Sequence, residues 1–88
     1  MAKPKVGDVV RLVGDQVGDM EFGRVYATYD RIDVWWDTGT GENKVALMDA
    51  LEEYGPELAS TATWYAEVEN TEYQGETMAV ASFECRPM

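Results

Sequence analysis

The chain has 88 residues, of which 45% are hydrophobic and 11% aromatic, and this length and composition are expected of one small ordered domain. Seventeen acidic residues against seven basic ones give a formal charge of −10 at pH 7. Such a surface repels phosphate backbones, so direct nucleic-acid binding is not expected. No apolar run is long enough to cross a membrane, and no secretory leader is expected. The single cysteine, Cys85, excludes an intrachain disulfide. We therefore expect a reduced, cytoplasmic protein.

Three extended runs are predicted in the first half of the chain, at residues 9–13, 22–29 and 32–37. Loops rich in glycine and aspartate separate the first two, which favours antiparallel pairing of successive strands. The run at 32–37 alternates most regularly, so we expect Trp36 to point into a core and Trp35 to point out of it.

The middle of the chain mixes strand and helix signals. Residues 38–43 have the composition of a turn, and residues 44–47 are predicted to be extended. Leu51 and Tyr54 continue the helical spacing that begins at Leu47, and a Gly-Pro pair follows them. A short helical turn is therefore predicted near residues 48–54.

The last third contains two further extended runs, at residues 61–69 and 77–85, joined by a polar loop. This pattern predicts a C-terminal β-hairpin. A two-stranded hairpin is marginal in water, so its apolar side chains are expected to pack on the rest of the domain. The side chains predicted to do so are Trp64, Val68, Met78 and Val80.

Short motifs in the first part of the chain are similar to a known class of binding domain. They are Val-Gly-Asp-Val-Val-Arg-Leu at 6–12, Phe-Gly-Arg-Val at 22–25, Ile-Asp-Val-Trp-Trp-Asp-Thr-Gly at 32–39 and Asp-Ala-Leu-Glu-Glu at 49–53. Over residues 5–54 the chain resembles the SH3-like small barrels (KOW and Tudor-type) of bacteria and phages. The resemblance implies a mainly β fold and a module that docks peptides, nucleic acids or proteins.

The chain departs from these families in two respects. KOW domains that touch RNA are normally basic, and Tudor-type readers of methylated side chains need an aromatic cage, for which the barrel offers only Tyr26, Trp35 and Trp36. The predicted fold is an SH3-like antiparallel barrel at 5–54, with the helical turn, and an added C-terminal hairpin at 57–88. All 88 residues are expected to form a single domain, with the hairpin extension packed on the barrel.

The sequence carries little catalytic chemistry. It has no histidine, and Cys85 lies among acidic residues that disfavour a thiolate. Residues 34–39 match the Asp-Thr-Gly signature of aspartic proteases, but Thr40 follows in place of the family's Ala or Ser and no later hydrophobic-hydrophobic-Gly element precedes a helix, so a strand ending in a turn explains the match. The acids at Asp15, Asp19 and Glu21 lack calcium-loop spacing. No enzymatic activity, metal or cofactor is expected.

A partner-binding surface is predicted where aromatic and acidic side chains share the outer faces of strands. If Val25 faces the core, Tyr26 faces outward beside Trp35, and such a pair ringed by acids is typical of a protein-binding hot spot. The predicted partner-binding residues are Tyr26, Asp33, Trp35, Asp37, Tyr65, Glu67 and Glu69. In the alternative interpretation the hairpin folds over this face and covers Trp35 with Trp64 or Tyr65.

Two functions remain open. The first is a non-enzymatic acidic protein-binding module, such as a small phage or bacterial inhibitor acting on a basic or nucleic-acid-binding host protein. The second is a structural or assembly protein, such as a virion component, that self-associates through the C-terminal hairpin. Both predict a protein partner, with a homo-oligomer in the second, and neither involves a membrane.

Overall fold

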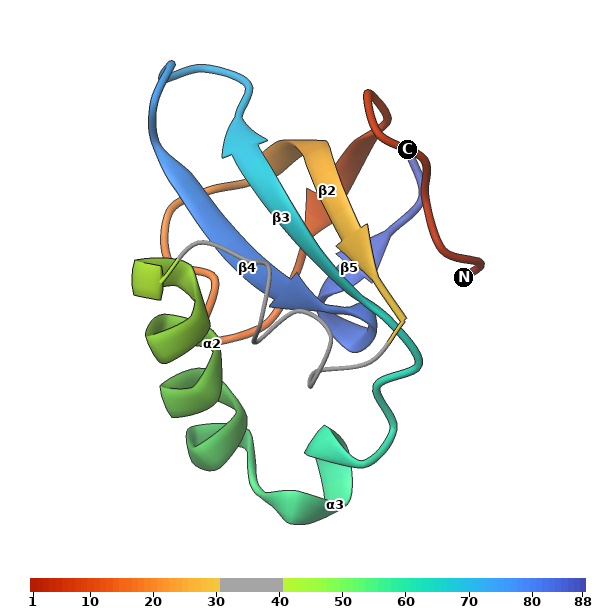
Figure 1. The fold of residues 1–88 in the computed structure, drawn as a ribbon, viewed down its shortest axis with the longest axis vertical. Coiled ribbons are helices and arrows are strands. Elements are labelled where there is room, and N and C mark those ends of the chain that lie inside the picture. Colours follow the sequence, from red (N-terminus) through yellow and green to blue (C-terminus); the bar gives the residue numbers. More distant parts are fainter. Residues whose placement is uncertain (31–40) are drawn as a thin grey trace.

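The computed structural model describes residues 1–30 and 41–88, and its fold is mainly β (Figure 1). Within these residues, five antiparallel strands form one sheet in the order β4-β3-β2-β1-β5, and the sheet is not closed. The elements are β1 (Val9–Leu12), β2 (Phe22–Tyr29), α2 (Gly41–Tyr54), α3 (Pro56–Ala59), β3 (Tyr65–Asn70), β4 (Thr77–Ala81), the 3₁₀ turn η1 (Ser82–Glu84) and β5 (Cys85–Arg86).

The sheet is a meander whose last strand returns to its first. β2 pairs with β1 and β3, and β3 also pairs with β4, with Val25 opposite Val68 and Val68 opposite Met78. After β4, the single turn of η1 carries the chain to β5, which pairs with β1 through Leu12 and Cys85. The two edge strands of the described sheet, β4 and β5, are therefore separated by only three residues.

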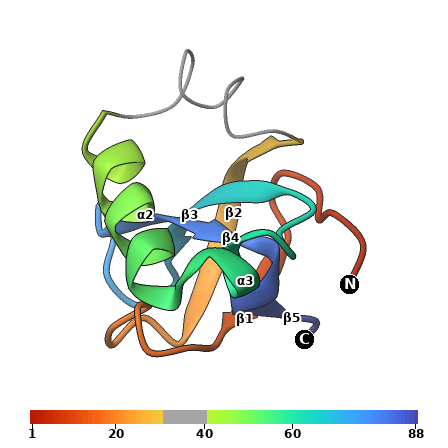
Figure 2. The same ribbon diagram turned by 90° about the horizontal axis from the view of Figure 1, so that it is seen from below.

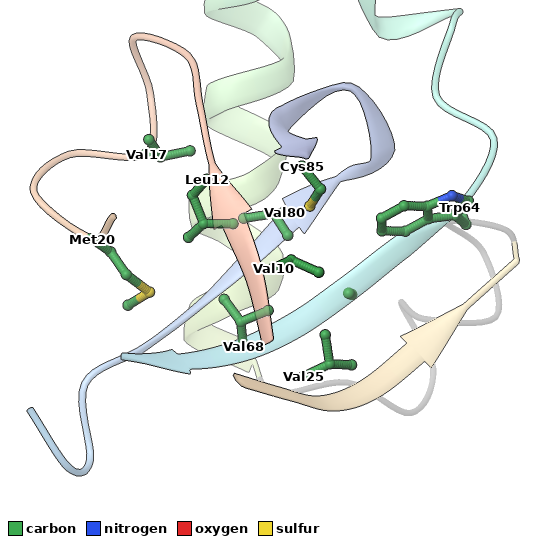
Figure 3. Packing of buried hydrophobic residues seen from close by; sticks show 10 residues of the cluster. Val10, Leu12, Val17, Met20, Val25, Trp64, Val68, Val80 and Cys85 are labelled. Carbon is green, nitrogen blue, oxygen red and sulfur yellow. The ribbon is translucent and has the colours of Figure 1, made fainter. Parts of the chain in front are cut away.

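One face of the sheet holds the main core (Figure 3). Its buried residues are Val10, Leu12, Val17, Met20, Val25, Trp64, Ala66, Val68, Val80 and Cys85, and Met78 packs against them. Trp64, Val68, Met78 and Val80, which were predicted to pack on the rest of the domain, all belong to this core or pack against it. The Trp64 indole also donates a hydrogen bond of 3.3 Å to the Met1 carbonyl, which ties the N-terminal segment to this core.

Helix α2 covers the opposite face of the sheet, alongside β3 and β4 (Figure 2). Its buried positions recur every four residues, at Asn43, Leu47 and Leu51, so one side of the helix faces the sheet. Leu47 and Leu51 pack on Ala79 and Ala81 of β4. Small side chains at these strand positions let the helix lie close to the sheet.

Helix α2 corrects the predictions for the middle of the chain. Residues 44–47 are helical and not extended, and the helical turn predicted at 48–54 is the second half of a longer helix. The reason is that Val-Ala-Leu-Met is compatible with either state, and the small face of β4 gives a helix here a surface to pack on. The helix ends at Gly55, whose φ of 95° is a conformation that glycine adopts readily.

The C-terminal strands are shorter than predicted and lie within the sheet. The run at 61–69 becomes a strand only from Tyr65, and the run at 77–85 is interrupted by η1 after Ala81. β3 pairs along the length of β2, so the hairpin of β3 and β4 continues the meander. The strand predicted at 32–37 lies outside the described residues.

Candidate protein-interaction surface

The predicted partner-binding residues do not form one surface in the part of the chain that the structure describes. Asp33, Trp35 and Asp37 lie outside it. Tyr26 is 39% exposed while its neighbour Val25 is buried, as strand alternation requires. The Tyr26 hydroxyl accepts a hydrogen bond of 3.2 Å from the Asn43 side chain, so this tyrosine lies against the first turn of α2.

The other described members of the set lie on β3, and one of them is inaccessible. Tyr65 is half-buried in the cluster under α2, and burial raises the pKa of its hydroxyl. Glu69 accepts a hydrogen bond of 2.9 Å from the backbone of Gly75 in the β3–β4 loop. Glu67 is only 2% exposed, so it presents no carboxylate to a partner in this structure.

The burial of Glu67 follows from the position of β3 in the fold. β3 lies between β2 and β4, with the main core on one face, where Val68 packs. Glu67 is opposite Ala79 and Ala27, on the face that α2 covers. At Glu67 both faces of the strand are covered, and the prediction for Glu67 assumed a solvent side.

Helices α2 and α3 carry a group of exposed acidic residues. Between Val45 and Cys85 every charged residue in the sequence is acidic. Since Leu47 and Leu51 face the sheet, the helical period turns other positions toward solvent. The exposed acids of α2 and α3 are Glu42, Asp49, Glu52, Glu53 and Glu57. The outward side of α2 and the adjoining turn therefore form a negatively charged surface.

The basic residues are concentrated elsewhere. Lys44 is the only one in α2, and the other described ones are Lys3, Lys5, Arg11, Arg24 and Arg86. These belong to the N-terminal segment, β1, β2 and β5. Both chain ends lie on the side of the molecule opposite α2 in the two views (Figures 1 and 2). Most described basic residues thus lie away from α2 and α3, although exposed acids such as Asp8, Asp15 and Glu21 lie among them.

An apolar groove separates α2 from α3 within this acidic surface. It has a volume of about 470 Å³ and is lined by Met48, Asp49, Leu51, Glu52, Pro56 and Ala59. Met48 is 42% exposed although it is a large apolar side chain. The groove therefore has apolar walls with carboxylates beside them.

A buried hydrogen-bond network fixes the end of α2 that forms this groove. The Tyr54 hydroxyl donates to Glu84 Oε2 at 2.7 Å and accepts from the backbone N–H of Gln16 at 3.2 Å. Glu84 Oε1 accepts from the backbone of Ala81 at 3.0 Å. The network joins the β1–β2 loop, the last turn of α2 and η1, so it holds three segments that are distant in sequence.

Burial sets the protonation behaviour of this region. Desolvation raises the pKa of Glu84, although its hydrogen bonds with Ala81 and Tyr54 oppose the shift. Desolvation and the neighbouring Glu84 raise the pKa of Tyr54 to about 12. Desolvation, with a contribution from Glu84, also raises the pKa of the Cys85 thiol to about 12. Within the described residues, the hydrogen bonds of Glu84 and Tyr54 and the burial of Cys85 indicate a structural role for all three side chains.

Residues 1–30 and 41–88 contain neither a metal-binding cluster nor a membrane-spanning helix. No group of three acidic or cysteine side chains is arranged to hold a metal ion there. None of the helices in the same residues has the length and apolar character needed to cross a membrane.

The sequence-based prediction missed the groove residues Met48, Asp49 and Glu52. It placed them in a short helical turn at 48–54, but a strand was predicted just before that turn, so the longer helix and its solvent side were not predicted. A signal was present, because Asn43 precedes Leu47 by one helical repeat and Leu51 follows by another. Extending that period backwards from Tyr54 predicts a helix from about residue 43 and turns Asp49 and Glu52 outward.

Comparisons with known proteins give no relative from which a function can be transferred. No family model, no curated protein and no solved structure matches the chain.

Proposed function

We propose that the chain is a non-enzymatic acidic module that binds a protein partner through a basic surface on that partner. The observation that carries the proposal is the exposed acidic surface of α2 and α3, in a region where residues 45–85 contain no basic side chain. A small phage or bacterial inhibitor that occupies the basic surface of a nucleic-acid-binding host protein is the form of this function that the charge favours.

The placement of acids in α2 supports a role in binding. The last turn of the helix contains acidic residues and no basic one. A helix C-terminus carries partial negative charge, so Glu52 and Glu53 there destabilise the helix by about 0.3–1 kcal/mol each at low ionic strength. Carboxylates that do not help the helix are readily explained if they attract a basic partner.

We further propose that the fold is an SH3-like small barrel, a class whose members bind peptides, nucleic acids or proteins. The support is the meander of β1 to β4 followed by η1 and the return of β5 to β1. In this assignment the β3–β4 hairpin belongs to the barrel itself, and α2 is inserted between β2 and β3. The acidic charge then selects proteins over nucleic acids as partners.

A capture experiment tests the proposed function. The immobilised chain is incubated with bacterial lysate at low and at high salt, and the retained proteins are identified by mass spectrometry. We expect basic proteins to be retained at low salt and released at high salt, because exposed charges are screened. A variant with Asp49, Glu52 and Glu53 changed to lysine is expected to lose them. Retention that is absent, or equal at both salt concentrations, contradicts the proposal.

A second function, self-assembly through the C-terminal hairpin, is favoured by one observation. β4 lies at an edge of the described sheet, and an edge strand can pair with a copy of itself. Sedimentation velocity over a concentration series separates the two functions. Self-assembly predicts a sedimentation coefficient that rises with concentration, whereas the binding module remains a monomer.

A further inference from the structure

We propose that the groove between α2 and α3 is the docking site for a lysine- or arginine-rich segment of the partner that carries a bulky apolar anchor. The inference rests on the proposed function and adds the position and the chemistry of the contact. It assigns the apolar walls of the groove to the anchor and the neighbouring carboxylates to the basic side chains.

The shape and lining of the groove support an apolar anchor. Met48 and Leu51 of α2 face Pro56 and Ala59 across a space of about 470 Å³. Met48 is 42% exposed, so a substantial part of a large apolar side chain lies in water. An anchor that covers it gains from removal of apolar surface from water, and methionine adapts to varied partner shapes.

Charge complementarity favours lysine or arginine beside the apolar anchor in the partner segment. Asp49 and Glu52 line the groove, and none of its lining residues is basic. A purely apolar segment would desolvate these carboxylates without pairing them, and an acidic segment would be repelled by them. Lysine or arginine beside the anchor pairs with them. A basic segment with an apolar face therefore fits both parts of the groove.

The test uses a defined peptide probe. A lysine-rich peptide with leucines on one helical face is titrated into the ¹⁵N-labelled full chain, and amide shifts are followed by NMR. We expect the largest shifts at the residues that line the groove. Two control peptides, one with alanine in place of leucine and one with glutamate in place of lysine, are expected to bind at least tenfold more weakly.

A pair of matched variants separates the anchor from general charge attraction. Met48→Glu removes an apolar wall and adds a negative charge, and Val45→Glu adds the same charge at an exposed position of α2 that does not line the groove. We expect Met48→Glu to weaken peptide binding at least tenfold, or about 1.4 kcal/mol. Val45→Glu is expected to bind at least as tightly as the wild type. If Met48→Glu does not fold, Met48→Gln serves in its place.

The outcomes distinguish this inference from the proposed function. If Met48→Glu binds the peptide as tightly as Val45→Glu, or the shifts lie away from the groove, the docking site is wrong while charge-driven binding survives. If no variant binds the lysine peptide in a salt-dependent manner, the proposed function fails as well. If the wild type is a dimer that Met48→Glu dissociates, the groove holds a second copy of the chain and the proposal is overturned.

Discussion

A close contact between β2 and β3 allows a quantitative test of the sheet. A Cβ atom added at Gly23 would lie 2.8 Å from both Cβ and Cγ2 of Val68, which is fully buried and branched at Cβ. Gly23→Ala is therefore expected to cost about 1–3 kcal/mol of unfolding free energy through overpacking. Val68→Ala removes two methyl groups, worth about 0.8 kcal/mol each, and leaves a cavity, so it is expected to cost about 2 kcal/mol.

The double variant decides whether the two residues are in contact. Val68→Ala removes Cγ2 but keeps Cβ, so it relieves one of the two closest contacts of the methyl group that Gly23→Ala introduces. The double variant is therefore expected to cost less than the sum of the single variants by about 0.5 kcal/mol or more. Urea unfolding with unchanged m-values measures the four free energies. Gly23→Ala combined with Val80→Ala is the control, because Val80 is fully buried but lies on β4 opposite Ala66. Additive costs for Gly23 and Val68 would refute this β2–β3 packing.

Three further predictions concern the core and the C-terminal strands. Because burial raises the pKa of Glu84 above its ordinary value of 4.5, its carboxyl favours folding most below that pH, and this contribution is lost as pH rises through the folded-state pKa. The stability of Glu84→Gln measured by urea unfolding is thus expected to increase relative to wild type as pH rises from about 4 to about 8, and a constant difference would count against it. Cys85 is buried with a pKa of about 12, so a thiol reagent at a pH of about 8 is expected to label it only at the rate of unfolding, and fast labelling of the folded chain would contradict this. Truncation after Pro56 removes β3, β4 and β5, so circular dichroism is expected to show an unfolded or aggregated chain, and Trp64→Ala is expected to cost about 3–5 kcal/mol.

Some of this protein could be predicted from local sequence pattern. The alternation of apolar residues predicted the strands at 9–13 and 22–29 and the antiparallel pairing of the two runs that contain β3 and β4, and it placed Val25 inside and Tyr26 outside. Each of these predictions uses the alternation of apolar and polar residues within one short segment, and that alternation is visible in the local sequence. The mainly β character of the fold follows from them.

The candidate site was largely beyond such reasoning. The predicted surface combined residues at 33–37, which the structure does not describe, with β3 residues whose exposure depends on what covers them. Glu67 is buried on the face of the sheet where α2 packs on the neighbouring β4, and no local pattern places a helix there. The groove needs α2 and α3 side by side, and the break at Gly55 permits this arrangement.

By itself, the sequence determined the charge of the chain, the lack of histidine, the strand periodicity and the region without basic residues, because these are properties of composition and local order. Only the tertiary structure decided that residues 44–47 are helical, that Glu67 and Glu84 are buried and that Met48 lies beside Asp49 and Glu52 in a groove. The physical reason is that burial and helix formation in short ambiguous segments depend on contacts between residues distant in sequence. In this chain those contacts are the packing of α2 on β4 and the hydrogen bonds of Tyr54 and Glu84.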